Sequence, residues 1–137
     1  MRISTILALH APDTCSRNLL KMMSDLASQR GEQAHTHLAQ SAMEVAQVKA
    51  REGMTPAEFL DDVGLLMSDL VTAHCIFIDE TDVRRVGRAR AMINYAPIGK
   101  DGFCTGCKDL IRLGNRRCGT CAARTRLHRN VRIGRAG

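Results

Sequence analysis

The chain has 137 residues, which suffices for one domain or for a small domain with an appendage, and which excludes a large multidomain enzyme. Hydrophobic residues make up 45% of the sequence but aromatic residues only 3%, so the core must be built from aliphatic side chains, a composition that favours helices. No apolar stretch reaches the roughly 18 residues that a membrane span requires. The apolar run at residues 3–9 is short and is followed by His10 and Asp13, so we expect no secretory signal and a cytoplasmic location.

The net charge of +6 conceals two halves of opposite sign. Residues 1–82 contain 6 basic and 12 acidic residues, a balance of −6, whereas residues 83–137 contain 14 and 2, a balance of +12. All but two of the cations in the second half are arginines, whose planar guanidinium groups match phosphates and carboxylates. The basic half therefore predicts an anionic partner.

The helical spacing of apolar residues predicts the first two helices. One begins after Asp13 or Thr14, either of which can cap it, and ends at Gly31. The second is expected over residues 32–52, with Gly53 as its stop.

The third predicted helix has the clearest N-terminal signal. Thr55 is a capping hydroxyl, Pro56 stands at the first helical position and Glu58 can reach back to the cap. An apolar stripe continues at helical spacing as far as His74, which is interpreted as a core histidine. We therefore expect one packed helix over residues 55–74.

Changes of composition divide the rest of the chain. Residues 75–78 are apolar and predict a helix end or a buried turn, and a basic helix is expected over residues 83–95. Pro97 and Gly99 end that helix, and a segment rich in Gly, Cys and Arg follows. The expected organisation is an acidic helical domain at 1–97, a zinc-ribbon module at 98–129 and a basic tail at 130–137.

Two Cys-x-x-Cys pairs separated by ten residues are the most specific motif: Cys104 and Cys107, then Cys118 and Cys121. Each pair can direct both sulfurs to one side of a turn, so two pairs close a tetrahedral site of four thiolates. The compact spacing favours zinc over an iron–sulfur cluster, and the lack of an export signal disfavours disulfides. Because protein fills all four positions, we expect one structural Zn²⁺ whose removal unfolds residues 100–125. The predicted fold class is mainly α, with a helical N-terminal part and a small C-terminal four-cysteine zinc ribbon.

The remaining cysteines and histidines have ordinary interpretations. Cys15 and Cys75 lack partners at ligand spacing and are expected to be buried thiols. On the helix expected there, His35 and His37 would point in different directions, so a shared metal is not predicted. His128 could replace a cysteine in the zinc shell, although four thiolates are already available.

An arginine cluster surrounds the predicted zinc site, which would hold the cluster together. Such clusters bind phosphate backbones by releasing counterions. The alternative is a solvated basic face that only confers solubility, and no recognition pattern for specific bases is visible. The candidate nucleic-acid or partner-binding residues are Arg112, Arg116, Arg117, Arg124, Arg126 and Arg129.

The stretch 101–107, the segment 111–113 and the second cysteine pair resemble the zinc finger of the DksA/TraR family of RNA polymerase-binding regulators. Members of that family insert an acidic helical tip into the polymerase secondary channel and rest the zinc finger at its rim. The resemblance implies that Asp79 and Asp82 form the acidic tip. Small phage and plasmid regulators, including late antiterminators with a zinc-stabilised module, have a similar size and charge layout.

We therefore expect a small zinc-binding transcription regulator that binds RNA polymerase, DNA or RNA, and that can form homo-oligomers through its helical part. No enzymatic activity is predicted, because the sequence shows no Gly-rich phosphate loop, nucleophile elbow, His-Glu-x-x-His motif or open metal site. A zinc-stabilised nuclease with His128 as general base lacks the further residues that such chemistry needs. The other alternative is a protein-interaction module, such as an antiterminator or an inhibitor of a nucleic-acid enzyme, whose arginines meet an acidic protein surface. No membrane partner is expected.

Overall fold

The computed structural model describes residues 5–94 of the chain. Within this part, strands and helices alternate, except that two helices follow one another between the second and third strands. All paired strands run parallel, because each helical connection returns the chain to the same end of the sheet. The elements are β1 (Leu7–Ala8), α1 (Arg17–Arg30), β2 (Ala34–Leu38), α2 (Ala42–Glu52), α3 (Pro56–Asp62), β3 (Leu70–His74), α4 (Glu80–Ala89) and β4 (Met92–Asn94).

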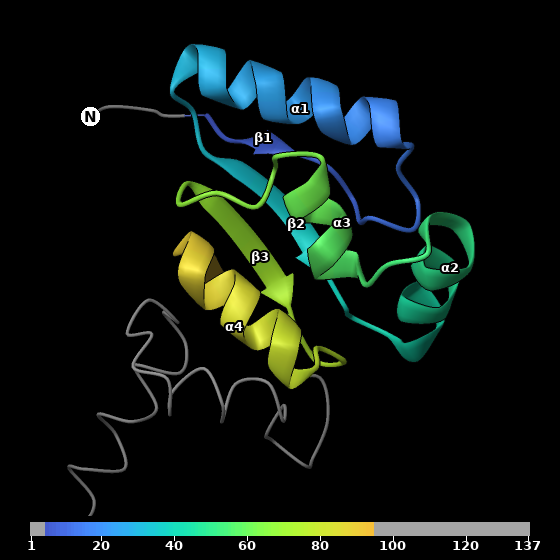
Figure 1. Ribbon diagram of the computed structural model, residues 1–137. Helices are drawn as coiled ribbons and strands as arrows, with labels where there is room; N and C mark the ends of the chain where they lie inside the picture. The colour runs from blue at the N-terminus through green and yellow to red at the C-terminus, as the bar shows by residue number, and fades with distance from the viewer. Residues whose placement is uncertain (1–4, 95–137) are drawn as a thin grey trace, which may run out of the picture.

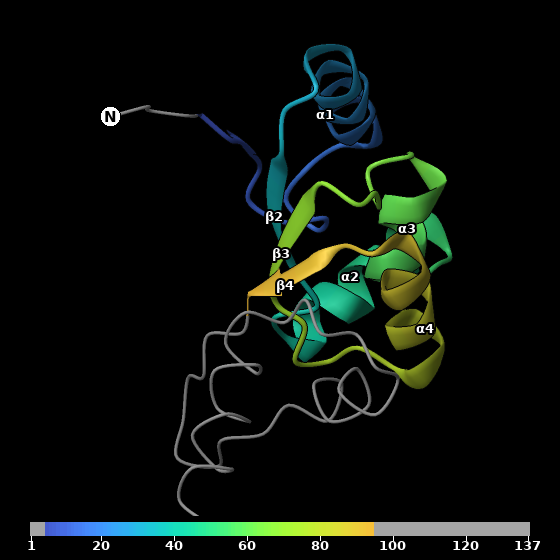
Figure 2. The same ribbon diagram turned by 90° about the vertical axis from the view of Figure 1, so that its left-hand side faces the viewer.

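The strands lie in the sheet in the same order as in the sequence, β1-β2-β3-β4. In Figure 1 the arrows of β2 and β3 point the same way, and Figure 2 shows the labelled helices on one side of the sheet. An open doubly wound sheet instead reverses its strand order and carries helices on both faces. A sequential order with helices on one face is the arrangement of consecutive units in the wall of a β/α barrel.

The alternation of side chains along β2 separates a core face from an open face. Ala34, Thr36 and Leu38 are completely buried on the helix side, whereas His35 and His37 are partly exposed on the opposite face. Among residues 5–94, no helix covers the face that carries these two histidines. Polar chemistry is therefore available on that face of the sheet.

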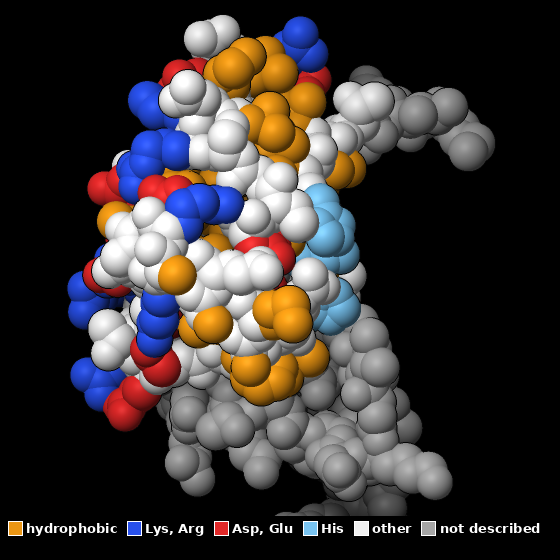
Figure 3. Space-filling model, turned by 90° about the vertical axis from the view of Figure 1, so that its right-hand side faces the viewer, with side chains coloured by type: hydrophobic (Ala, Val, Ile, Leu, Met, Phe, Trp, Pro, Cys, Tyr) orange, Lys and Arg blue, Asp and Glu red, His pale blue; other side chains and the backbone are white. Residues whose placement is uncertain are grey.

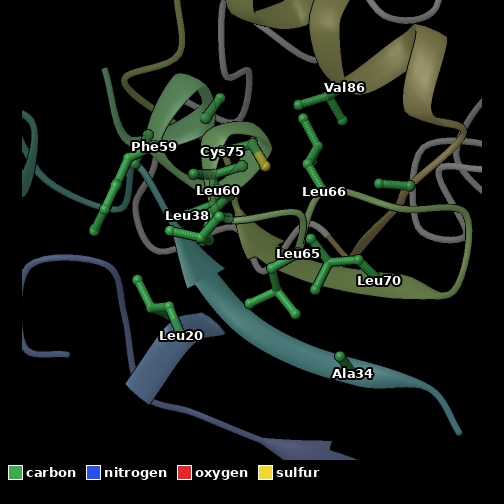
Figure 4. Packing of buried hydrophobic residues seen from close by; sticks show 14 of the residues in the cluster. Leu20, Ala34, Leu38, Phe59, Leu60, Leu65, Leu66, Leu70, Cys75 and Val86 are labelled. Carbon is green, nitrogen blue, oxygen red and sulfur yellow. The ribbon is translucent and has the colours of Figure 1, made fainter. Parts of the chain in front are cut away.

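The core lies between the sheet and the helices. Figure 4 shows Leu60 of α3 and Cys75, which follows β3, close to Leu38 of β2. Each fully buried aliphatic or aromatic side chain of this kind contributes roughly 1.5–3 kcal/mol relative to an exposed one. The largest fully buried apolar side chains are Phe59, Leu20, Leu38, Leu60, Leu65, Leu70, Val48, Val83 and Val86.

Local sequence signals explain where the helices begin and end. The predicted capping box is confirmed, since Thr55 accepts from the backbone N–H of Glu58 and the Glu58 side chain accepts from that of Thr55. The predicted stops at Gly31 and Gly53 are also confirmed, because both glycines adopt the left-handed conformation that ends a helix. The N-caps are Ser16, Ser41, Thr55 and Asp79.

The prediction of a mainly α fold is wrong, because two expected helices each contain a strand. The first part of the helix expected at 32–52 is β2, whose buried and partly exposed residues alternate with a period of two. The helix expected at 55–74 ends at Asp62, after which Gly64 turns the chain with a φ of +77° and β3 begins at Leu70. The apolar stripe that suggested one long helix is the sum of a helix, a turn and a strand.

The later elements differ less from expectation. The basic helix is present as α4, but it ends at Ala89 and the expected range 83–95 also contains β4. Residues 76 and 77 form a turn, but the predicted burial of this turn is confirmed only in part, since Phe77 is 50% exposed. The predicted four-cysteine segment at 98–129 lies outside the described residues. Of the helices that the structure describes, none has the length and hydropathy to cross a bilayer.

Candidate active site

Histidine side chains converge where β1, β2 and β3 end. The ring centroid of His37 lies 4.9 Å from that of His74, 5.1 Å from that of His10 and 6.0 Å from that of His35. Figure 3 shows histidines gathered at one margin of the molecule, whereas most of the Lys and Arg side chains in this view lie toward the opposite margin. The carboxyl ends of parallel strands are where β/α folds build their ligand sites.

The strand conformation of β2 explains why His35 and His37 share a face. Residues two apart in a strand point to the same side, whereas on a helix they diverge by about 200°. The prediction that these two histidines point in different directions is therefore wrong, because it rested on a helix at this position. His37 stands one residue before the end of β2, next to the turn that leads into α2.

His74 reaches the cluster through an unusual backbone conformation. It is the last residue of β3 and pairs in register with Leu38, which faces the core. Simple alternation would direct His74 to that same side, but its φ is +74° and the φ of Cys75 is +53°. A left-handed backbone costs a non-glycine residue of the order of 1–3 kcal/mol, and such residues cluster at functional sites.

Two nitrogen atoms in the cluster are buried without a hydrogen-bond partner among the described residues: Nδ1 of His37 and Nδ1 of His74. An unpaired buried polar atom costs stability, so its presence calls for an explanation, of which a bound ion or a catalytic role is one. Burial, followed by the charges of His37 and His35, lowers the pKa of His74; burial and His37 likewise lower the pKa of His35. Both shifts favour neutral imidazole, which is the form that binds metal ions.

The turn after β1 brings His10 to the same place. The carbonyl of His10 accepts from the backbone N–H of His37 at 2.9 Å, which extends the pairing of β1 with β2. The ring nitrogen Nδ1 of His10 lies 2.9 Å from the hydroxyl of Thr14. This contact orients the imidazole and leaves Nε2 as the ring nitrogen that can meet a ligand.

Arg51 of α2 fixes the loop that contains His10. Its guanidinium donates to three backbone carbonyls, those of Pro12 at 2.7 Å, Asp13 at 2.8 Å and Cys15 at 3.1 Å. Hydrogen bonds from a charged donor are about twice as strong as neutral ones. The loop between β1 and α1 is thus held against α2 through its main chain.

The two aspartates predicted as an acidic tip lie at the start of α4 and make structural hydrogen bonds. Asp79 is the N-cap of α4 and accepts from the backbone N–H of Asp82 at 2.9 Å. Asp82 is 4% exposed and accepts from the hydroxyl of Thr55 at 2.8 Å. The carboxylate of Asp82 therefore joins the start of α4 to the start of α3.

The other predicted site residues cannot be located, because they lie outside the described residues. Their zinc binding, their partner binding and the domain boundaries near residues 97 and 129 stay predictions. Among residues 5–94, no group of three or more His, Cys, Asp or Glu side chains is arranged to hold a metal ion. The residues concerned are Cys104, Cys107, Cys118 and Cys121, together with Arg112, Arg116, Arg117, Arg124, Arg126 and Arg129.

Comparison with known proteins identifies the family. A model of the amidohydrolase family matches residues 1–135, and the chain belongs to that family. It is 35% identical over 97 residues to a 5′-deoxyadenosine deaminase of Methanopyrus kandleri, covering 71% of this chain and 22% of that protein. It is 37% identical over 95 residues to a 5-methylthioadenosine/S-adenosylhomocysteine deaminase of Pyrococcus furiosus, covering 69% and 23%. The chain thus spans about a quarter of the length of these relatives.

Solved structures with the same fold include zinc-containing proteins. An adenosine deaminase from Xanthomonas campestris with bound zinc superimposes with a TM-score of 0.72 at 29% identity, covering 80% of this chain and 26% of that one. An atrazine chlorohydrolase from Arthrobacter aurescens complexed with zinc gives a TM-score of 0.64 at 19% identity, covering 72% and 22%. The second likeness concerns the fold alone.

These comparisons correct several predictions. The resemblance to DksA/TraR regulators is wrong, since the amidohydrolase match runs through residues 1–135, including the segment that carried the resemblance. The predicted fold class, a mainly α protein with a zinc ribbon, is wrong because the amidohydrolase match and the zinc-containing adenosine deaminase structure indicate an α/β fold with a parallel sheet. The expectation of a non-enzymatic transcription regulator, and its alternative of an antiterminator or inhibitor, are also wrong, because the family consists of hydrolytic enzymes. The expectation of RNA polymerase, DNA or RNA as partners is wrong as well, because the relatives are named as deaminases of small adenosine derivatives.

The sequence did contain a signal for the histidine cluster. The segment Ala34–Leu38 alternates small or apolar residues with histidines, a period-two pattern that indicates a strand with one polar face. Read as a helix, the same segment separates its histidines. His74 carried no such signal, because its orientation depends on a backbone conformation that the apolar run around it does not encode.

Proposed function

We propose that this chain forms part of the metal site of an amidohydrolase that deaminates an adenosine-type nucleoside, with His37 and His74 as metal ligands. The observation that carries the proposal is a pair of buried Nδ1 atoms that lack a hydrogen-bond partner within the part of the chain that the structure describes, on imidazole rings 4.9 Å apart at neighbouring strand ends. A metal ion, or a second polar group, would satisfy atoms whose burial is otherwise unfavourable.

The donor set fits a zinc ion in part. Imidazole nitrogen is a preferred zinc ligand, and a catalytic zinc site takes three protein ligands and leaves a position for water. The described residues supply two imidazoles at the centre of the cluster, so the proposal requires further ligands from outside residues 5–94. Bound zinc would lower the pKa of its water ligand and so supply a hydroxide nucleophile near neutral pH.

The relatives suggest the substrate class. The curated relatives are named for 5′-deoxyadenosine, 5-methylthioadenosine and S-adenosylhomocysteine, all adenosine derivatives altered at the 5′ position. Deamination joins the oxygen of water to the ring carbon that bears the amino group, breaks the carbon–nitrogen bond and releases ammonia. In this chain, His10 is oriented by Thr14 beside His37 and is proposed to hydrogen-bond the substrate.

The proposal is tested by following the histidine rings during a zinc titration. Imidazole resonances of His37 and His74 should shift on addition of zinc, and His37→Ala or His74→Ala should remove the response of the remaining ring. His35→Asn is the matched control, since it lies on the same strand face but at a ring distance of 6.0 Å from His37. Unchanged His37 and His74 resonances at saturating zinc would contradict the assignment.

The substrate class is tested separately. With zinc present, 5′-deoxyadenosine should shift the ring resonances of His10 and His37, whereas uridine should not, and ammonia release should depend on the purine nucleoside. Equal responses to both nucleosides would argue against an adenosine-type substrate.

The four cysteines support a second, independent proposal of one structural zinc ion, because their paired spacing suits tetrahedral thiolate coordination. Cobalt(II) distinguishes the two sites, since thiolate ligands give intense charge-transfer absorption in the near ultraviolet and imidazoles do not. A variant with Cys104→Ser and Cys118→Ser should lose that absorption and retain the histidine response. If the unmodified chain shows no thiolate band, the four-cysteine site is wrong.

A further inference from the structure

Glu44 is a buried carboxylate to which the proposed metal site assigns no role. Its side chain belongs to the first turn of α2, and the residue is only 1% exposed. Burial raises the pKa of Glu44, and hydrogen bonds from the backbone amides of Gln40 and Ala39 act in the opposite direction. A carboxylate in such a place must be compensated by strong hydrogen bonds.

Both oxygens of Glu44 bind the turn that follows β2. Oε1 accepts from the backbone N–H of Ala39 at 2.8 Å, and Oε2 accepts from that of Gln40, also at 2.8 Å. In an ordinary capping box the carboxylate reaches back to the N-cap residue, which here is Ser41. Glu44 instead reaches past the cap to the two preceding residues.

The turn that Glu44 holds is strained. Ala39 has a φ of +48°, a left-handed conformation that alanine rarely adopts. Two charge-assisted hydrogen bonds to Ala39 and Gln40 stabilise this conformation. The strained residue stands two positions after His37, so the shape of the turn affects how β2 ends.

The same turn is bonded to the chain that follows β3. The carbonyl of Ala39 accepts from the backbone N–H groups of Ile76 at 3.0 Å and Phe77 at 2.9 Å, and the carbonyl of Leu38 accepts from that of Cys75 at 2.8 Å. A continuous path of hydrogen bonds thus leads from the Glu44 carboxylate through Ala39 to the residues directly after His74. In Figure 1, α2 lies near the end of β2 to which this turn belongs.

We infer that Glu44 is a positioning residue that sets the separation of His37 and His74 by holding the turns after β2 and β3 together. The inference rests on the proposed function, in which those two histidines bind the metal. Glu44 does not touch the imidazoles; it acts on the main chain that ends the two strands. Groups that hydrogen-bond metal ligands directly change metal affinity by ten- to a hundredfold when altered, and we expect a group that acts through the main chain to lie at the lower end of that range.

The decisive variant is Glu44→Gln. Glutamine has the same size but only one acceptor oxygen, so its amide NH₂ must face one of the two backbone N–H groups. We expect the ring resonances of His37 and His74 to move in the metal-free chain, and zinc affinity at these histidines to fall by about tenfold. If a side chain of this size merely fills space, glutamine should leave both quantities unchanged.

Ser41→Ala is the matched control. It removes the hydroxyl that accepts from the backbone N–H of Glu44 at 3.1 Å, so it weakens the same end of α2 without removing either bond to Ala39 or Gln40. This variant should lower the urea midpoint of unfolding and leave the histidine resonances in place. Ring shifts as large as those of Glu44→Gln would overturn the inference.

A measurement on the unmodified chain covers the case in which Glu44→Gln does not fold. Scalar couplings across hydrogen bonds should connect the amide nitrogens of Ala39 and Gln40 with the Glu44 carboxyl carbon. Absence of both couplings would overturn the inference. Failure of the proposed function is distinguishable, because zinc would then leave the His37 and His74 rings of the unmodified chain unaffected while the couplings persist.

Discussion

The helix ends and the strand ends of this molecule follow different rules. The helices begin at Ser, Thr or Asp caps whose side chains accept backbone N–H groups, and α1 and α2 end at left-handed glycines. The ends of β2 and β3 instead place Ala39, His74 and Cys75 in left-handed conformations and bury imidazole nitrogens that have no hydrogen-bond partner among residues 5–94. The comparison teaches that most helix ends are satisfied by local caps, with the left-handed Arg90 after α4 as an exception, whereas stability is given up where the histidines meet.

The helical side should show the largest loss of stability. Phe59 of α3 is completely buried, and the guanidinium groups of Arg17 and Arg51 lie 4.9 and 5.7 Å from the centre of its ring. Phe59→Ala should lower the free energy of unfolding by about 3–5 kcal/mol, because it leaves a cavity and removes the ring that both guanidinium groups contact. Urea denaturation measures the change, and Phe59→Leu should cost clearly less. If Phe59→Ala lowers the free energy of unfolding by less than about 1 kcal/mol, the helical side does not carry the stability assigned to it.

The strand ends should respond in the opposite sense. His74→Gly should raise the free energy of unfolding of the metal-free chain by about 0.5–1 kcal/mol, because glycine adopts a φ of +74° without strain. His74→Ala is the control, since it retains Cβ and therefore the strain. Both variants should lose the zinc response of His37. If glycine and alanine give equal stability, the left-handed backbone of His74 does not carry the cost assigned to it.

The titration of Asp82 on the helical side should make the free energy of unfolding depend on pH. Burial raises the pKa of this carboxyl above the ordinary 3.8, with the hydrogen bond from Thr55 acting against that rise. As pH increases through 3.8, the unfolded chain therefore loses this proton first, and the free energy of unfolding falls until the folded carboxyl also ionises.

Asp82→Asn removes this titration and should flatten the fall in stability on the alkaline side of pH 3.8. At pH 7 the change should be less than about 1 kcal/mol, because the amide oxygen still accepts from Thr55. Thermal unfolding between pH 3 and pH 7 provides the measurement. An unaltered pH profile would show that Asp82 does not titrate differently in the two states.

The smallest effect is expected on the solvent side of α4. Arg84 and Glu80 form an ion pair one helical turn apart, with side chains that are 55% and 69% exposed. Arg84→Ala should change the free energy of unfolding by less than about 0.5 kcal/mol, because solvent and side-chain entropy offset the attraction of exposed pairs. A larger loss in a denaturation experiment at 0.15 M salt would show that the outer face also carries stability.

Prediction from sequence succeeded at most sites where the responsible interactions are local, although the cap expected at Asp13 or Thr14 is wrong, since the N-cap of α1 is Ser16. The Thr55 capping box and the glycine stops depend on residues within one helical turn, and all of them are present in the structure. Strands require partners that are distant in the sequence, so β2 and β3 were taken for parts of helices. A period-two pattern over only five residues competes poorly with apolar stripes on either side of it.

The candidate site was missed for a related reason. His10, His37 and His74 are separated by 27 and 37 residues, and only the parallel pairing of β1, β2 and β3 brings them together. The cysteine motif attracted attention because its spacing is local and its chemistry is recognisable without a fold. The histidines, which are far apart in the sequence, required the register of the sheet.

Arg51 has a consequence for how this protein can change over evolutionary time. Its three contacts with the loop after β1 are all to carbonyl oxygens, which every amino acid possesses. The loop therefore keeps its path whichever side chains occupy the positions that Arg51 fastens, provided that they fit their surroundings. The exposed positions of this loop can therefore change without loss of the contacts that Arg51 makes, whereas Thr14, which contacts His10, and the buried Ala11 and Cys15 remain constrained.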